Sequence, residues 1–470
     1  MLKKINLLLE NKWVPISFRI MTLIAFLGLV IIGFSGASTD PVFLKQLSRT
    51  NLTTSFVWRL WWPLIILTAI IFGRVWCMVC PVEMITTFFA KTGLKLKRPQ
   101  WILSGWGITI FYTIIVIVGI RILQMEFNPR YTSSYLLIIV GISIVSGLIF
   151  EKNTFCRYIC PVGYVLGIFS KMAIWGWRVK KRSVCDACSD KSCIKRNYTY
   201  QLNYKSCGVD LVPAEINDNN HCLLCSGCLK TCKTYRTNSN PLRPNPALIK
   251  IGFANDLLQI KPLLIAEWVF LLILSAHLID EISEFQLISN ISFSFIPGAI
   301  PNYLSTNMSP DKVIIGVAFL FFLLPVVLWI LPYILILLTR MRISIGSYSK
   351  NFCQIFLPII ISLFAGAIIM EIATKLPYYK YFVHDLSGVK TIQGILTRQI
   401  VVTRLPGWTQ WALLINLIIV LITGIFMSFR VIRKLVIKFN IQEKKSVLYS
   451  LPFIFVLVFF TEVFMYQYFK

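Results

Sequence analysis

Eight of the thirteen cysteines lie in one stretch of the chain, between Cys185 and Cys232. Four of them form the run CLLCSGCLKTC, residues 222–232, whose spacing is typical of bacterial ferredoxins. In such a run the thiolates bind the irons of four-iron clusters. The sequence CDACSDKSC and Cys207 supply four further thiols, so the stretch predicts two [4Fe-4S] clusters.

The spacing also predicts which cysteines share a cluster, because the fourth cysteine of such a run binds the other cluster in two-cluster ferredoxins. The first insert set is therefore expected to be Cys185, Cys188, Cys193 and Cys232. The second insert set is expected to be Cys207, Cys222, Cys225 and Cys228. The alternative is a pair of zinc sites with four cysteines each, although zinc ribbons use isolated C-x2-C pairs rather than this run.

Four more cysteines stand in two Cys-Pro elements, FGRVWCMVCPVEMITTFFAK at residues 72–91 and FCRYICPVGYVLGIFSK at residues 155–171. From the Cys-Pro step onward the two elements run in register, and each follows a pair of apolar segments. This indicates a parallel internal repeat, related by an axis along the membrane normal. Pro81 and Pro161 suit the first turn of a following interfacial helix, where the missing N–H of proline has no intrahelical partner to lose.

The repeat predicts that four thiols meet near its axis. We call them the Cys-Pro quartet: Cys77, Cys80, Cys156 and Cys160. They could bind a further cluster or metal, or they could act as redox-active dithiols. The plainer alternative is that they are small packing residues, since cysteine is readily buried. The repeated Cys-Pro pairing favours chemistry over packing, and metal slightly over dithiols.

The rest of the composition belongs to a membrane protein. Of 470 residues, 56% are hydrophobic, and the mean hydropathy is +0.71. Long apolar runs in such a chain predict an all-α polytopic membrane protein. We expect nine spans, centred on residues 20–36, 55–73, 102–120, 134–150, 261–279, 313–338, 353–372, 408–429 and 447–468. The first run has no small-residue cleavage site after it, so it is expected to be a retained span.

The net charge of +27 agrees with basic cytoplasmic loops, which follow the positive-inside rule. No soluble basic reading module is visible, so a nucleic-acid partner is not expected. The rule places the N-terminus and residues 151–257 in the cytoplasm, where reducing conditions disfavour disulfides. We therefore expect an integral protein of the bacterial cytoplasmic (inner) membrane, with metal ligation as the leading role of the cysteines.

Three domains follow from these patterns. Residues 1–178 are expected to form two parallel two-span repeats, each ending in a Cys-Pro element. Residues 179–257 are expected to form a small cytoplasmic ferredoxin-like insert, which is short for a hydrophobic core of its own and would need metal to hold it. Residues 258–470 are expected to form a five-span membrane domain of unknown role.

Ionisable residues inside spans are the functional candidates of the second half. By the predicted topology, Glu371, Glu462 and His277 lie in the outer half of the membrane. Oxidation of a quinol releases protons, and a carboxylate or histidine there could accept them. The plainer alternative is that these side chains reach lipid head groups. No dinucleotide or Walker motif stands in a suitable context, so the clusters require an external redox partner.

The motifs RVWCMVCP, FCRYICP, CDACSDKSC and CLLCSGCLKTC together resemble the NapH/NosR-type membrane polyferredoxins. The resemblance covers about residues 15–250. It differs at Cys77 and Cys80, which have two residues between them where the family usually has three. It implies electron transfer between the quinone pool, cytoplasmic donors and reductases outside the membrane. A related branch of the family serves oxidase assembly.

The expected function is therefore iron–sulfur electron transfer between a membrane carrier, quinone or quinol, and a cytoplasmic or membrane redox partner. The chain could be a component of a quinol dehydrogenase-type oxidoreductase. Two alternatives are an assembly or maturation factor that reduces a metal or thiol for another respiratory complex, and a redox-sensing membrane protein. The first alternative predicts that the Cys-Pro thiols matter more than any quinone site.

Overall fold

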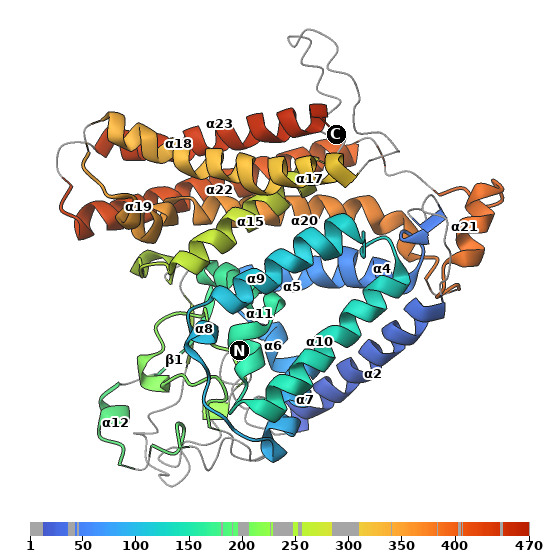
Figure 1. Cartoon of the computed structure of the whole chain (residues 1–470), viewed down its shortest axis with the longest axis horizontal. Helices are drawn as coiled ribbons and strands as arrows, with labels where there is room; N and C mark the ends of the chain where they lie inside the picture. Colours follow the sequence, from blue (N-terminus) through green and yellow to red (C-terminus); the bar gives the residue numbers. More distant parts are fainter. Residues whose placement is uncertain are drawn as a thin grey trace. The chain divides into compact units, whose positions relative to one another are not determined.

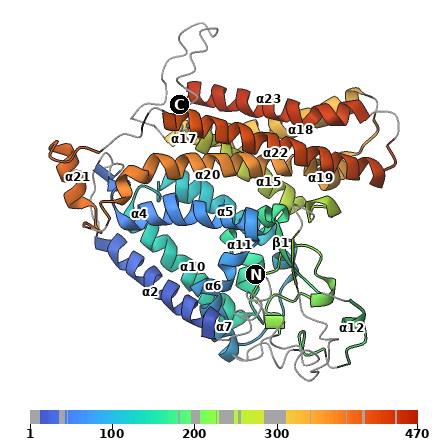
Figure 2. The same cartoon turned by 180° about the vertical axis from the view of Figure 1, so that it is seen from behind.

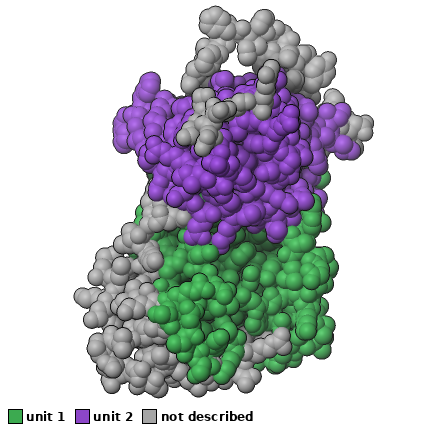
Figure 3. Space-filling model, turned by 90° about the vertical axis from the view of Figure 1, so that its left-hand side faces the viewer, with its two compact units in different colours: residues 1–111, 122–257, 375–403 green, residues 112–121, 258–374, 404–470 purple. Residues whose placement is uncertain are grey.

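The computed structural model of the chain is almost entirely helical (Figure 1). It describes residues 13–35, 43–44, 47–179, 182–189, 191–195, 206–225, 227–228, 248–251, 256–283, 310–339, 341–382, 384–402, 406, 408–441 and 445–469. The chain divides into two compact units, coloured separately in Figure 3. Unit 1 comprises residues 1–111, 122–257 and 375–403, and unit 2 comprises residues 112–121, 258–374 and 404–470.

Seven helices in the described residues are long and apolar enough to cross a membrane. They are α2 (Trp13–Ser35), the α4–η1–α5 helix (Leu52–Phe72), α10 (Pro129–Ile149), the α17–η8–α18 segment Ile314–Leu338, α20 (Leu357–Tyr379), α22 (Trp408–Lys438) and the α23 segment Val447–Gln467. The chain is thus an integral membrane protein by the length and composition of its helices.

The other two predicted spans are also helices. The segment Trp106–Ile122, made of α9 and η2, is apolar but shorter than the seven. The helix α15 (Ile265–Ser283) has 19 residues and carries Glu267, His277, Asp280 and Glu281, and it is not among the seven. The count of nine spans and their orientation therefore stay predictions.

The second span shows how the sequence sets the limits of a helix. Asn51 is the N-cap of α4 (Leu52–Phe56), and its side chain accepts hydrogen bonds from the N–H groups of Thr53 and Thr54 at 3.0 and 3.2 Å. One wide turn, η1 (Val57–Trp61), leads into α5 (Trp62–Phe72). The helix ends at Gly73, whose φ of +73° is a conformation that other residues rarely adopt.

The two Cys-Pro elements fold alike. A short helix, α6 (Val75–Val79) or η3 (Phe155–Ile159), precedes each Cys-Pro step. Cys80 and Cys160 are then the N-caps of α7 (Pro81–Thr92) and α11 (Pro161–Phe169). The prediction that Pro81 and Pro161 open a helix is confirmed. The packing is reciprocal, because α7 of the first repeat packs on α10 of the second, whereas α11 packs on α5 of the first (Figures 1 and 2).

A two-stranded antiparallel sheet joins the two ends of the cysteine-rich stretch. The strand β1 (Trp175–Arg178) precedes the cysteines and pairs with β2 (Leu248–Ile251), which follows them, with Trp175 opposite Ile251. The remaining short elements of unit 1 are α8 (Gln100–Leu103), η4 (Ser170–Met172), α12 (Arg182–Asp186), η6 (Pro213–Glu215) and α21 (Val389–Leu396). The strand pair closes the insert as one loop on the membrane helices.

Unit 2 is built around α15. This helix is buried on almost all sides, with Phe270, Ala276 and Leu278 fully enclosed, and it packs against α18 (Leu324–Leu338), η8 (Phe319–Leu323) and α23 (Lys445–Phe469). Ser275 accepts a hydrogen bond from Trp329 Nε1 at 3.0 Å, which satisfies both polar groups inside the bundle. The remaining short elements of unit 2 are α17 (Pro310–Ala318), α19 (Ile345–Asn351), η9 (Phe352–Ile355) and η7 (Leu257–Gln259).

Candidate redox centre

The structure brings the second insert set together. Cys222 and Cys228 each lie within electrostatic range of Cys225 and Cys207. Burial, with the neighbouring thiols adding to it, raises the pKa of Cys222 to about 12 and that of Cys228 well above its usual value. These values describe thiols without bound metal. An iron ion would reverse the preference, because a coordinating thiol is deprotonated.

Hydrogen-bond donors point at the sulfur atoms of this set. Trp177 Nε1 donates to Cys228 Sγ at 3.1 Å, and the N–H of Leu211 donates to Cys207 Sγ at 3.3 Å. Trp177 also packs with Cys222 and Leu224 in a small apolar cluster. Donors to sulfur stabilise a thiolate and tune the potential of a cluster bound to it. The donor set therefore fits a thiolate-ligated iron–sulfur cluster.

Among the described residues, no three His, Cys, Asp or Glu side chains converge closely enough to share one metal ion. A four-iron cluster places each thiolate on a different iron, so its ligands stand farther apart than the ligands of a single ion. The thiols of the second insert set lie within electrostatic range of one another, and their role as cluster ligands stays a prediction.

One segment of the second insert set rests on the second Cys-Pro element. Residues 206–211, which contain Cys207, receive a backbone hydrogen bond from Asn153 N to Gly208 O at 2.9 Å. Arg157 Nη1 donates to the carbonyl oxygen of Val209. Asp210 is held by Lys152 and Arg98, and although burial opposes it, these cations lower the pKa of its carboxyl.

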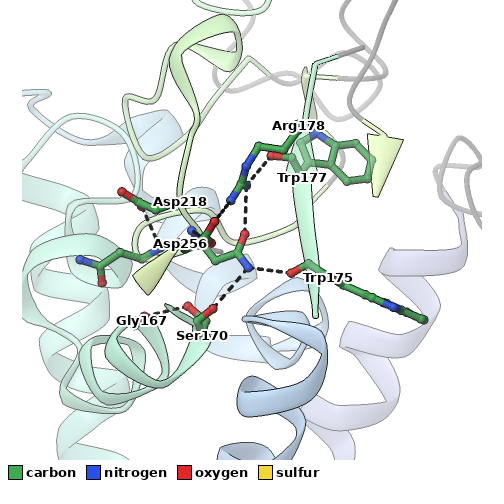
Figure 4. A network of polar contacts seen from close by, with 9 residues as sticks. Gly167, Ser170, Trp175, Trp177, Arg178, Asp218 and Asp256 are labelled. Atoms are coloured by element: carbon green, nitrogen blue, oxygen red, sulfur yellow. Dashed lines mark hydrogen bonds and ion pairs between the residues drawn. The ribbon is translucent and has the colours of Figure 1, made fainter. Parts of the chain in front are cut away.

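The other segment, residues 218–224, rests on the first Cys-Pro element and on the end of α11, and Figure 4 shows the polar contacts at Ser170 and Trp175. Arg74 Nη1 donates to Asn220 O at 2.9 Å. Asn219 Nδ2 donates to the carbonyl oxygens of Trp175, at 2.6 Å, and Ser170, at 3.4 Å. This segment leads directly into Cys222, so the ferredoxin-type run starts from a fixed position on the membrane helices.

An ion pair secures the same contact. Arg178 Nη2 lies 2.5 Å from Asp256 Oδ1, and Asp256 Oδ2 accepts the N–H of Asn219 at 2.9 Å (Figure 4). Arg178 Nη1 also donates to Asn219 Oδ1 at 3.1 Å. Breaking such a buried pair by removing one partner commonly costs about 3–5 kcal/mol. The pair thus ties the end of the insert to its beginning.

The first insert set is only partly described. Cys185 lies in α12, and Cys188 and Cys193 follow in the turns after it, all three half-buried. The N–H of Cys207 donates to the carbonyl oxygen of Cys193 at 2.9 Å, so the two sets adjoin along the backbone. Cys232, the predicted fourth ligand of this set, lies outside the described residues. The assignment of ligands to the first set stays a prediction.

The structure also brings the Cys-Pro quartet together. Cys156 lies within electrostatic range of Cys160, Cys80 and Cys77, and Cys80 lies within range of Cys77 and Cys160. Cys160 Sγ accepts the N–H of Gly163 at 3.3 Å, in the first turn of α11. Burial raises the pKa of Cys80 to about 12 and that of Cys160 to about 11, although the backbone N–H groups at the two helix N-termini favour the thiolates.

Charged side chains are buried beside the quartet. Arg74 is 2% exposed, and its Nη2 donates to Cys156 O at 3.3 Å. Glu83, in the first turn of α7, pairs with Arg19 at 2.8 Å and accepts Asn153 Nδ2 at 2.6 Å.

His221 lies beside Cys222, and burial together with the charges of Arg157 and Arg74 lowers its pKa to about 3.

The three residues of the predicted proton site lie in α15, α20 and α23. Glu462 is 5% exposed, and within the described part of the chain neither of its carboxylate oxygens has a hydrogen-bond partner. His277 is 6% exposed, with Nε2 3.7 Å from Glu281 and its ring 6.2 Å from that of Phe364. Glu371 is half-buried near the end of α20.

A further polar contact in unit 2 was not foreseen. Arg121 pairs with Asp280 of α15 and donates to the hydroxyl of Tyr466 of α23 at 2.5 Å. Sequence reasoning also missed Arg74, Trp177, Asn219 and Asn220, which hold the second insert set in place. Only Arg74 could have been singled out from the sequence, because it stands three residues before Cys77. Asparagines in a loop have no pattern that would indicate such a role.

Comparison with known proteins agrees with this chemistry. Residues 54–99 and 134–185 match the family described as a 4Fe-4S binding domain. The two matched segments contain the two Cys-Pro elements and end at Cys185, before the run at residues 222–232. No solved structure matches the chain.

Two uncharacterized proteins of Methanocaldococcus jannaschii are similar to this chain. One is 26% identical over 175 residues, covering 36% of this chain and 65% of the relative, and the other is 22% identical over 188 residues, covering 36% and 73%. The regulatory protein NosR of Stutzerimonas stutzeri is 22% identical over 227 residues, or 40% of this chain. The match covers only 30% of NosR. The chain is thus a distant relative of NosR over that segment, and an integral membrane protein whose residues 54–99 and 134–185 match a 4Fe-4S binding domain.

Proposed function

We propose that this protein transfers electrons through iron–sulfur clusters between a membrane carrier, quinone or quinol, and a redox partner that meets the insert. The insert would hold two [4Fe-4S] clusters, one on each insert set. Its side of the membrane would be the cytoplasm of a bacterium, as the positive-inside rule favours.

One observation carries the proposal. The two segments that hold the second insert set rest on the two Cys-Pro elements: residues 206–211 on Arg157 of the second, and residues 218–224 on Arg74 of the first and Ser170 of the second. A soluble ferredoxin needs no such attachment. Fixing a cluster against the ends of membrane helices is what electron exchange with a membrane carrier requires, because the geometry is then set before each transfer.

Glu462 supports a proton-accepting role on the quinone side. A carboxylate buried without a hydrogen bond costs several kcal/mol in a membrane span, so such residues are functional candidates by default. Its helix α23 packs on α15, which carries His277. Oxidation of a quinol releases two electrons and two protons, and Glu462 and His277 would take up protons while the clusters take up electrons.

The test is metal analysis of the full-length protein, purified anaerobically in detergent. About eight irons and eight acid-labile sulfides per chain are expected for two four-iron clusters, with EPR signals after reduction. The variant C225S should lose about four irons. The control C353S changes a buried cysteine outside both insert sets, which accepts Trp268 Nε1 at 3.1 Å in unit 2, and it should keep all the irons. Zinc in place of iron, or equal losses in both variants, would refute the proposal.

The gathering of the Cys-Pro quartet favours a second candidate, an assembly factor that reduces a metal or thiol for another respiratory complex. Four thiols lie within electrostatic range of one another, two of them at helix N-termini, and such a group could exchange between dithiol and disulfide forms. In that case the double variant C77S/C156S should no longer reduce the metal or thiol of the other complex, while quinol still reduces the insert clusters. Loss of quinol-linked cluster reduction in the same variant would instead place the quartet on the electron path.

A further inference from the structure

We propose that Arg74 supplies the positive charge that balances an anionic redox centre on the Cys-Pro quartet, and that it couples this centre to the second insert set. The inference rests on the proposed electron-transfer function and names a positioning residue for it. Arg74 ligates nothing itself. It acts through its charge and through the two carbonyl groups that it holds.

The first argument is burial. Arg74 is among the largest enclosed side chains of the described structure, at 2% exposure. A buried guanidinium is costly unless charge and hydrogen bonds compensate it. The ion pairs found in the described residues give carboxylates to Arg19, Arg98, Arg121, Arg178 and Arg182, and none of them involves Arg74. Its hydrogen-bond acceptors are the carbonyl oxygens of Asn220 and Cys156, and its Nε has no partner.

The second argument is the location of the guanidinium. A Cβ placed on Gly163 would lie 2.6 Å from Arg74 Nη2, 3.0 Å from Cys156 O and 3.6 Å from Cys160 Cβ. The charge thus stands at the first turn of α11, directly beside two quartet cysteines, and it acts electrostatically on Cys160. Glu83, the nearest buried acid of the quartet, is already paired with Arg19.

The third argument is that the two terminal nitrogens of the Arg74 guanidinium contact both thiol sets. Nη1 holds the carbonyl of Asn220, two residues before Cys222, and Nη2 holds the carbonyl of Cys156. One planar group therefore touches the backbones of both thiol sets. Arginine can do this because its donors form a rigid fork, whereas lysine offers a compact point charge.

Quartet thiolates bound to iron would carry the negative charge that Arg74 lacks among its described neighbours, because a coordinating thiol is deprotonated even where burial raises the pKa of the free thiol. Reduction adds a further negative charge, so a buried cation beside the centre makes reduction easier. Removing that cation is expected to move the midpoint potential of the quartet centre to more negative values. Arg74 would thus keep the quartet centre reducible, so that it could accept an electron from the insert or pass one to it.

The experiment is a redox titration of the purified full-length protein followed by EPR. The signal that disappears in C77S/C156S is assigned to the quartet. R74Q should shift the midpoint of that signal negatively by about 59 mV, a tenfold change for one electron. R74K should keep the midpoint near that of the unaltered protein. The control R178Q/D256N removes hydrogen bonds from the same contact in a charge-neutral way, and it should leave the quartet midpoint unchanged.

Several outcomes would overturn the inference. R74Q with an unchanged midpoint and full iron content would do so, as would equal shifts in R74Q and R74K. The absence of any signal that depends on C77S/C156S would also reject it, while eight irons at the insert would leave the proposed function standing. If R74Q does not accumulate in the membrane, the accumulation and iron content of R74K become the test. Normal values in R74K support a role for the charge of Arg74. Values as low as those of R74Q contradict it.

Discussion

Gly167 of α11 lies so close to Asn220 that an added Cβ would be 2.6 Å from both the carbonyl oxygen and the side-chain oxygen of Asn220. Cβ atoms essentially never lie that close to an oxygen atom, so a larger residue at position 167 must displace the segment that leads to Cys222. Overpacking of this kind typically costs about 1–3 kcal/mol. We expect G167A to loosen the insert, seen as faster proteolysis of residues 206–225 and a lower melting temperature in detergent.

The matched control for that change is G141A. Nothing lies within 4 Å of a Cβ at Gly141, which is also in a helix of unit 1. Alanine in a helix interior is favoured over glycine by about 0.5–1 kcal/mol, so G141A should be neutral or slightly stabilising. Equal protease sensitivity in both variants would show that α11 does not hold the insert.

Trp177 is expected to tune the cluster on the second insert set. W177F removes the N–H that donates to Cys228 Sγ at 3.1 Å but keeps an aromatic ring in the apolar cluster. Loss of a hydrogen bond to sulfur lowers the reduction potential of a cluster. For one such bond, the equilibrium constant for reduction is expected to fall by less than about tenfold. W175F is the control, because the Trp175 ring packs on Phe72. A midpoint that moves equally in both variants would argue for a packing effect.

Glu462 is expected to matter for proton uptake and little for folding. E462Q replaces a buried carboxyl whose oxygens have no hydrogen-bond partner with an amide of the same shape. Loss of a general base commonly slows a reaction about 100-fold or more, so quinol-driven reduction of the clusters should slow by this order. E267Q changes an acid that accepts the N–H of Leu264 at 2.8 Å at the start of α15, and it should react normally. Equal rates in E462Q and unaltered protein would exclude the role.

Asp385 predicts a pH dependence. Burial raises the pKa of its carboxyl, but hydrogen bonds from the N–H of Thr391, from Ser387 and from the N–H of Gly388 outweigh burial and lower it. A carboxyl with a lowered folded-state pKa stabilises the fold above its ordinary pKa of about 3.9, and the effect fades as pH falls through the lower value.

Hydrogen exchange of the amides of α21 would test this. Corrected for the intrinsic effect of pH, protection is expected to be constant above about pH 5 and to fall under more acidic conditions. D385N should reduce protection at all pH values and remove the acid transition. An unchanged transition in D385N would mean that another group titrates.

Much of this architecture could be predicted from the sequence because the signals are local. Hydropathy alone finds the long helices, and the Cys-Pro steps alone find the starts of α7 and α11. For α15 the local signal is weaker, and its role as a span stays a prediction. Its acids and His277 lower its hydropathy, and packing within unit 2 encloses it.

The attachment of the insert could not be predicted, because it depends on groups without a sequence signature. The carbonyl oxygens of Asn220 and Cys156 become partners of Arg74 only after the chain has folded. Gly167 leaves room for Asn220, which is 53 positions later in the sequence, and no spacing rule predicts that contact. The same holds for Arg178 and Asp256, which meet only when β1 and β2 pair.

The reciprocal packing of the repeats has a consequence for synthesis. α7 packs on α10, which leaves the ribosome about forty residues later, and α5 packs on α11, later still. Neither Cys-Pro helix can therefore settle until the second repeat has entered the membrane. During that interval Cys77 and Cys80 wait in the nascent chain without their partners Cys156 and Cys160. The quartet can therefore be completed only after the second repeat has been made, and until then its first two thiols lack the neighbours that they have in the folded protein.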